Sequence, residues 1–105
     1  MIKVTKKGFR GQGIYVGRPS KWGNPFKLRR HGGRYSLRES LRLYKKWIES
    51  KPELIDELVQ VYKEKGELVL DCWCVERVYS KASEIKRVKC HAEILAWLVL
   101  REVSK

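Results

Sequence analysis

The sequence predicts a small α/β (or α+β) domain in which about three helices pack on one small central sheet. Three observations support this prediction: short β-prone runs among glycines in the N-terminal third, two helical segments in the middle, and an apolar run followed by a last helical segment. The chain has 105 residues, of which 43% are hydrophobic. Because this is enough for one core, we expect a single domain over residues 1–105.

The N-terminal third is predicted to contain two short strands and a long loop. Residues 2–5 and 13–16 are rich in β-prone side chains and flank a glycine-rich turn. Prolines and glycines prevent regular structure over residues 17–35. A loop of this length is uncommon in a small domain and usually carries function.

Two helices are predicted in the middle of the chain. Ser36 and Glu39 form a capping box, and apolar residues at helical spacing follow them. Ser50 and Glu53 form a second box, with a proline in the first helical turn, where its missing N–H is harmless. Gly66 is the expected end of the second helix.

An apolar run over residues 67–75 predicts a central strand that is covered on both faces. Side chains alternate along a strand, so Cys72 and Cys74 are expected on one face and Asp71 and Trp73 on the other.

The C-terminal part ends in a predicted helix over residues 91–103, because its apolar residues fall on one helical stripe. Residues 76–89 are polar and basic and allow two predictions. They form either an excursion loop or a backward extension of the last helix.

The net charge of +12 is concentrated at one end of the chain. Residues 1–38 contain eleven basic residues and no acidic one, whereas residues 39–105 contain thirteen basic and twelve acidic residues. Clustered, uncompensated positive charge is typical of a site for a polyanion. We therefore expect a nucleic acid or a nucleotide as the partner. The eleven basic residues are Lys3, Lys6, Lys7, Arg10, Arg18, Lys21, Lys27, Arg29, Arg30, Arg34 and Arg38.

The composition argues against several other classes of protein. No apolar run approaches the ~20 residues of a membrane span, and no apolar segment follows the basic N-terminus as in a secretory signal. We therefore expect a cytoplasmic protein without a membrane partner. Three cysteines do not suggest a disulfide scaffold, and few Asn and Gln residues among many charged ones are typical of thermophiles.

The loop over residues 17–35 combines aromatic, glycine and basic residues. Aromatic rings among basic side chains offer base stacking together with phosphate contacts, and glycine N–H groups can bind an anion. Alternatively, Trp22 and Phe26 anchor the loop to the core. The candidate ligand-binding residues of this loop are Arg18, Lys21, Trp22, Asn24, Arg29 and Arg30.

A second group of candidate residues lies near the end of the central strand and the start of the last helix. Cys90 and His91 are candidate catalytic residues, because a thiol in the first turn of a helix faces the positive end of the helix dipole, which lowers its pKa. Cys74 is a further ligand-binding candidate, since open α/β sheets bind ligands beyond the carboxyl ends of their strands. Two alternatives are buried structural cysteines, and a zinc site made by the three cysteines and His91.

These motifs resemble those of a family of phage, bacterial and archaeal domains, the domain-of-unknown-function family 4326. Its members carry Tyr-Ile/Val-Gly-Arg, Gly-Asn-Pro-Phe, Cys-Trp-Cys and Cys-His motifs, which match residues 15–18, 23–26, 72–74 and 90–91 here. Fifteen residues separate the last two motifs, where the family has a short proline-containing link. The resemblance implies a small α/β domain in which the Gly-Asn-Pro-Phe loop and the Cys-His helix start share one pocket. It implies no substrate.

Together, these features predict a small intracellular domain that binds a nucleotide or nucleic acid, with a Cys/His pocket at the carboxyl end of the central strand. Arg18 is expected to bind a phosphate, Asn24 to hydrogen-bond a base or the backbone, and Cys90 to act as a nucleophile or a thiolate ligand. One alternative is a non-catalytic nucleic-acid-binding module, and another is a virus- or phage-type interaction protein, both with structural cysteines. We expect no cofactor and no metal.

Overall fold

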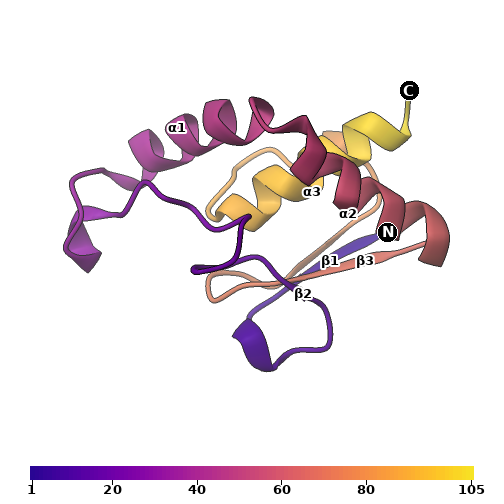
Figure 1. Cartoon of the computed structure of the whole chain (residues 1–105), viewed down its shortest axis with the longest axis horizontal. Coiled ribbons are helices and arrows are strands. Elements are labelled where there is room, and N and C mark those ends of the chain that lie inside the picture. Colours follow the sequence, from indigo (N-terminus) through magenta and orange to yellow (C-terminus); the bar gives the residue numbers. More distant parts are fainter.

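The computed structural model describes all 105 residues and confirms the α/β class (Figure 1). A layer of three helices lies on a four-stranded sheet. The helices are α1 (Leu37–Glu49), α2 (Pro52–Lys65) and α3 (His91–Val103). The strands are β1 (Ile2–Thr5), β2 (Ile14–Tyr15), β3 (Leu68–Asp71) and β4 (Arg77–Tyr79). Short 3-10 turns lie in the connections: η1 (Gly8–Arg10), η2 (Arg29–His31) and η3 (Ala82–Glu84). None of the helices is long and apolar enough to span a membrane.

The strands follow the order β2-β3-β1-β4 across the sheet. Strand β3 runs parallel to both β1 and β2, whereas β4 pairs with β1 in the antiparallel direction. The prediction of a central strand in this region is therefore confirmed for β3. Because β1, β2 and β3 are parallel, the segments that leave their carboxyl ends meet at one edge of the sheet.

The helices cover only one face of the sheet (Figure 1). Ile2, Val4 and Leu70 are fully buried beneath them, while Lys3 and Val78 lie on the open face. The prediction that the central strand is covered on both faces is wrong. The apolar run is continuous for another reason: β3 ends at Asp71, and the residues that follow it form a bend in which Cys72 and Val75 are buried while Trp73 and Cys74 are exposed.

The helix boundaries follow most of the local signals. The Ser36–Glu39 capping box is present, with each side chain accepting from the backbone N–H of the other residue, and Gly66 ends α2 in the left-handed conformation at φ 74°. The second capping box is absent. Ser50 instead caps the end of α1, where its hydroxyl donates to the carbonyl of Trp47 over 2.6 Å.

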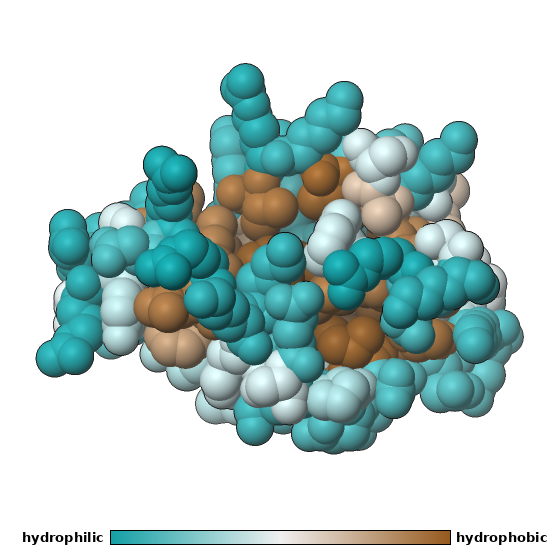
Figure 2. Space-filling view, turned by 90° about the horizontal axis from the view of Figure 1, so that it is seen from above, coloured by the Kyte–Doolittle hydropathy of each residue, from teal (hydrophilic) through white to brown (hydrophobic).

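Residues 76–89 form neither of the two predicted structures. They contain β4 and η3, and α3 begins only at His91, with Cys90 as its N-cap. Helix α3 is the core helix, because eight of its thirteen residues are buried and it packs against α1, α2 and β1. Seen from the helical side, apolar side chains lie between long hydrophilic ones that project from this layer (Figure 2).

Candidate functional site

A cavity of about 690 Å³ lies where β2 and β3 end, which is the edge of the sheet where the sequence predicts a pocket. Its walls come from segments that are distant in the chain: the loop after β2, η2, the start of α1, the bend after β3 and the start of α3. A volume of this size is typical of sites for small molecules.

The cavity contains six of the nine candidate site residues, and three lie elsewhere. Those that line it are Arg18, Asn24, Arg30, Cys74, Cys90 and His91. Those that do not are Lys21, Trp22 and Arg29.

Lys21 and Trp22 attach the loop to α2 instead of lining the cavity. The Lys21 ammonium pairs with the Glu57 carboxylate at 2.6 Å, and the Trp22 indole N–H donates to the carbonyl of Leu54 over 3.0 Å. Trp22 is also packed against the hydrophobic core. The alternative prediction, that Trp22 anchors the loop to the core, therefore fits its position better than the prediction that it stacks on a base.

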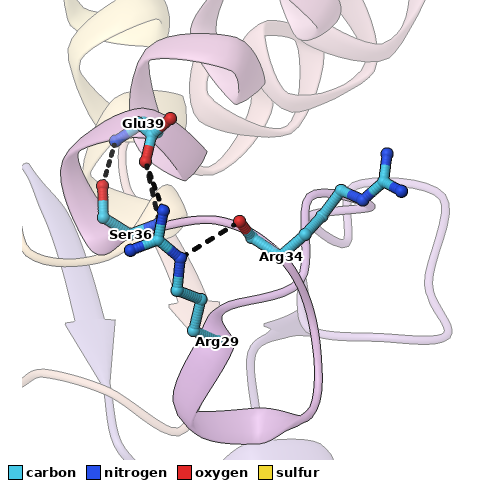
Figure 3. A network of polar contacts seen from close by, with 4 residues as sticks. All are labelled: Arg29, Arg34, Ser36 and Glu39. Carbon is cyan, nitrogen blue, oxygen red and sulfur yellow. Dashed lines mark hydrogen bonds and ion pairs between the residues drawn. The ribbon is translucent and has the colours of Figure 1, made fainter.

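Arg29 belongs to the network that starts α1 (Figure 3). Its guanidinium lies 3.6 Å from the Glu39 carboxylate, and its Nε donates to the carbonyl of Arg34 over 3.3 Å. Glu39 also forms the capping box with Ser36. The hydrogen bond with the Ser36 side chain, and then the one with the Ser36 backbone, lowers the pKa of Glu39. Arg29 therefore has a local acidic partner, unlike Arg30 beside it.

Asn24 lines the cavity, but most of its hydrogen bonds are made within the protein and fix the loop. Its amide donates to the Ser40 hydroxyl over 2.8 Å, and its oxygen accepts from the backbone N–H of Phe26 over 2.9 Å. The Ser40 hydroxyl in turn donates to the Phe26 carbonyl over 2.5 Å. One N–H of the Asn24 amide is left for a ligand, so the residue acts mainly as a positioning residue.

The Cys-Trp-Cys segment is a bend, and its side chains do not alternate as a strand predicts. Cys72 is buried and Cys74 is exposed, although both are expected on one face; Asp71 is buried and Trp73 is exposed. The backbone leaves the sheet after Asp71 to reach β4, and this turn breaks the period of two.

The three cysteine thiols interact with one another at the end of β3 and the start of α3. Cys90 is the N-cap of α3, so the predicted helix start is correct. However, contacts with the Cys72 and Cys74 thiols, together with burial, raise the pKa of Cys90. The predicted fall in this pKa is therefore wrong.

His91 joins this thiol group to the loop after β2. Its Nε2 lies 2.7 Å from the Val16 carbonyl, to which it must donate, so Nδ1 is left as an acceptor 3.8 Å from the Cys90 sulfur. Burial lowers the pKa of His91 below its usual value. The pair is therefore in contact, with a neutral imidazole beside a protonated thiol.

We predict that acidification destabilises the protein partly through His91. Because the pKa of His91 is lowered in the folded state, the unfolded chain takes up this proton more readily. Its contribution to the free energy of unfolding is therefore complete above about pH 6.5 and falls as the pH drops below that value. His91→Gln keeps a donor for the Val16 carbonyl and should flatten this fall in urea unfolding between about pH 7 and pH 5.

The matched control for this experiment is His31→Gln on the exposed turn η2, which should retain the pH dependence of the wild-type protein. An unchanged pH dependence in His91→Gln would show that His91 contributes nothing to acid destabilisation.

Several residues that line the cavity were not predicted as site residues. They are Lys89, His31 and Trp73, together with Tyr15 at the end of β2. Sequence signals for two of them exist, since Lys89 precedes the Cys-His motif and Trp73 lies inside Cys-Trp-Cys. No group of three or more His, Cys, Asp or Glu side chains is arranged to hold a metal ion.

The fold and the cavity define a small two-layer α/β domain with a basic pocket that contains thiols. Over residues 2–101 the chain matches the model of the family described as Domain of unknown function (DUF4326), and it belongs to this family. The family indicated by the sequence motifs is thus confirmed. No curated protein and no solved structure matches the chain.

Proposed function

We propose that this domain binds a nucleotide in the cavity, either free or as part of a nucleic acid. The observation that carries the proposal is the charge of the lining: Arg18, Arg30 and Lys89 line the cavity, and none of its lining residues is acidic. Such a concentration of positive charge in a concave site favours a ligand that carries phosphate.

The three cations of the cavity are free to bind a ligand. None of them forms an ion pair within the protein. Their neighbours Lys21 and Arg29 differ in this respect, because each has a glutamate partner from an adjacent helix. The basic residues that form ion pairs thus lie outside the cavity, whereas the basic residues without an acidic partner line it.

The rest of the lining suits the other parts of a nucleotide. The aromatic rings of Tyr15, Phe26 and Trp73 offer surfaces for a base. The start of α3 also borders the cavity, because Cys90 and His91 are among its lining residues. We also propose the cytoplasmic location that the sequence predicts, which agrees with a nucleic-acid partner.

Thiol chemistry in the same cavity is a second candidate function. The observation that favours it is the exposed thiol of Cys74, which lines the cavity and contacts the two buried cysteines. A thiol in a ligand site can act as a nucleophile.

We predict salt-dependent binding of nucleic acid that depends on the cavity cations. The double substitution Arg18→Glu and Arg30→Glu should weaken binding of a labelled oligonucleotide at least tenfold, because each change removes one phosphate contact. It should also lower the slope of log affinity against log salt by about two. Fluorescence anisotropy between about 50 and 200 mM salt measures both quantities.

The matched control is Lys63→Glu with Lys65→Glu, which changes the net charge equally at the far end of α2. This variant should bind nearly as well as the wild-type protein. Equal losses in the two variants would mean that net charge, and not the cavity, attracts the oligonucleotide. Absence of binding by the wild-type protein at the lowest salt would overturn the proposed function.

A further inference from the structure

An exposed aromatic cluster continues from the cavity onto the neighbouring surface. Phe9 in η1 and Trp73 in the bend after β3 are 64% and 57% exposed. The ring centre of Phe9 lies 5.7 Å from that of Trp73 and 6.0 Å from that of Tyr15, with the planes nearly perpendicular. Tyr15 and Trp73 also line the cavity, so the cluster and the cavity form one continuous surface.

Hydrogen bonds and close packing hold the cluster in place. The Trp73 indole N–H donates to the Tyr15 hydroxyl over 3.0 Å, and this hydroxyl donates to the Arg18 carbonyl over 2.6 Å. Gly8 has a φ of +57°, and a side chain there would collide with the Trp73 ring. The chain thus keeps two large rings in a fixed arrangement while leaving them in solvent. An exposed, ordered aromatic patch of this kind marks an interaction site.

The charges around the cluster indicate the kind of partner. Lys6, Lys7 and Arg10 flank Phe9 in the chain, and the Arg10 guanidinium lies 6.0 Å from the Phe9 ring centre. No acidic residue occurs anywhere in residues 1–38. A partner that is both flat and anionic fits this surface, because its rings can stack while its charges meet the basic residues.

We propose that Phe9, Tyr15 and Trp73 form a base-stacking platform for single-stranded nucleic acid, and that the bound strand continues from this platform into the cavity. The inference rests on the proposed function and adds the class of substrate to it. Bases of a duplex are stacked on one another and cannot lie on protein rings without being unpaired. A single strand exposes a face of each base, and stacking on an aromatic side chain tolerates any sequence.

Binding of Phe9→Ala to a labelled single strand of about 12 nucleotides, and to the duplex that this strand forms with its complement, tests the proposal. The wild-type protein should prefer the single strand. Phe9→Ala should lose at least about fivefold in affinity for it and little for the duplex. Phe9 is exposed, so the variant should fold, and its melting temperature checks this. Val78→Ala, a substitution at an exposed apolar residue on β4, is the matched control and should leave both affinities unchanged.

Tryptophan fluorescence provides a second measurement. The single strand should quench the emission of the wild-type protein, and Trp73→Phe should remove most of this quenching, although three other tryptophans remain. Equal binding of single strand and duplex by the wild-type protein, or a Phe9→Ala variant that binds like Val78→Ala, would overturn the platform while leaving the proposed function intact. A dimer that forms through Phe9 in the absence of nucleic acid would also overturn it.

Discussion

Alkylation of the native protein is expected to modify Cys74 at least about ten times faster than Cys90 near neutral pH. Cys74 is exposed in the cavity, whereas Cys90 is only 2% exposed and its pKa is raised by the neighbouring thiols. Cys72 should also react slowly, because its sulfur is buried and donates to the Thr5 carbonyl over 3.2 Å. Mass spectrometry of each cysteine peptide after timed exposure to iodoacetamide measures the three rates.

The pH dependence of these rates provides a further check. Contact with Cys72 raises the pKa of Cys74, so its rate should keep rising with pH beyond about 8.5, where an ordinary thiol is already half ionised. Cys74→Ser should remove the fast reaction and leave the fold intact, and urea should make the remaining thiols equally reactive. A Cys90 that reacts first would restore the helix-start nucleophile expected from the sequence. Equal protection of all three thiols, together with a metal in the purified protein, would support the zinc alternative.

Local signals explain why the helices were largely predictable. The Ser36–Glu39 capping box and the left-handed Gly66 depend only on residues within one or two helical turns, so the local sequence is enough to predict them. The error at Ser50 has a local cause too. A serine between two helices can cap the end of the first or the start of the second, and in this chain it donates back to Trp47.

The strands depend on partners that are distant in the chain, and they were harder to predict. Strands β1 and β2 are neighbours in sequence, yet β3 lies between them, and its residues are more than fifty positions away. Strand β4 has only three residues, and its apolar residues Val78 and Tyr79 are adjacent, so no alternating pattern reveals it. It forms because β1 offers an unpaired edge.

The candidate site was predictable by region but not by side chain. Parallel strands and the Cys-His helix start bring Arg18, Cys74 and Cys90 together, as the motifs suggest. Whether a loop residue faces the cavity or the protein depends on tertiary partners. The carboxylate of Glu57 binds Lys21 and the carbonyl of Leu54 binds Trp22, and neither partner is visible in the local sequence.

Asp71→Ala is expected to lower the free energy of unfolding by about 3 kcal/mol, a large part of the stability of a small domain. Asp71 ends β3 and is 1% exposed. Its carboxylate accepts from the Thr5 hydroxyl over 2.5 Å and from the Gly13 N–H over 2.7 Å, so it joins the carboxyl ends of β1 and β3 to the residue that precedes β2. The backbone at Gly11 approaches this carboxylate so closely that a side chain there would collide with it.

Removal of the carboxylate leaves two donors without a partner in a site that water reaches poorly, and this is the physical reason for the large loss. Urea unfolding measures it, and Asp56→Ala on the exposed side of α2 is the control, with an expected change within about 0.5 kcal/mol. Asp71→Asn keeps one acceptor but turns an N–H₂ group toward a donor, so its loss should be intermediate. Amide hydrogen exchange at Gly13 should accelerate in Asp71→Ala, because this N–H loses its acceptor. A stability loss below about 1 kcal/mol with unchanged exchange would show that the carboxylate does not hold the loop between β1 and β2, from which Phe9 projects.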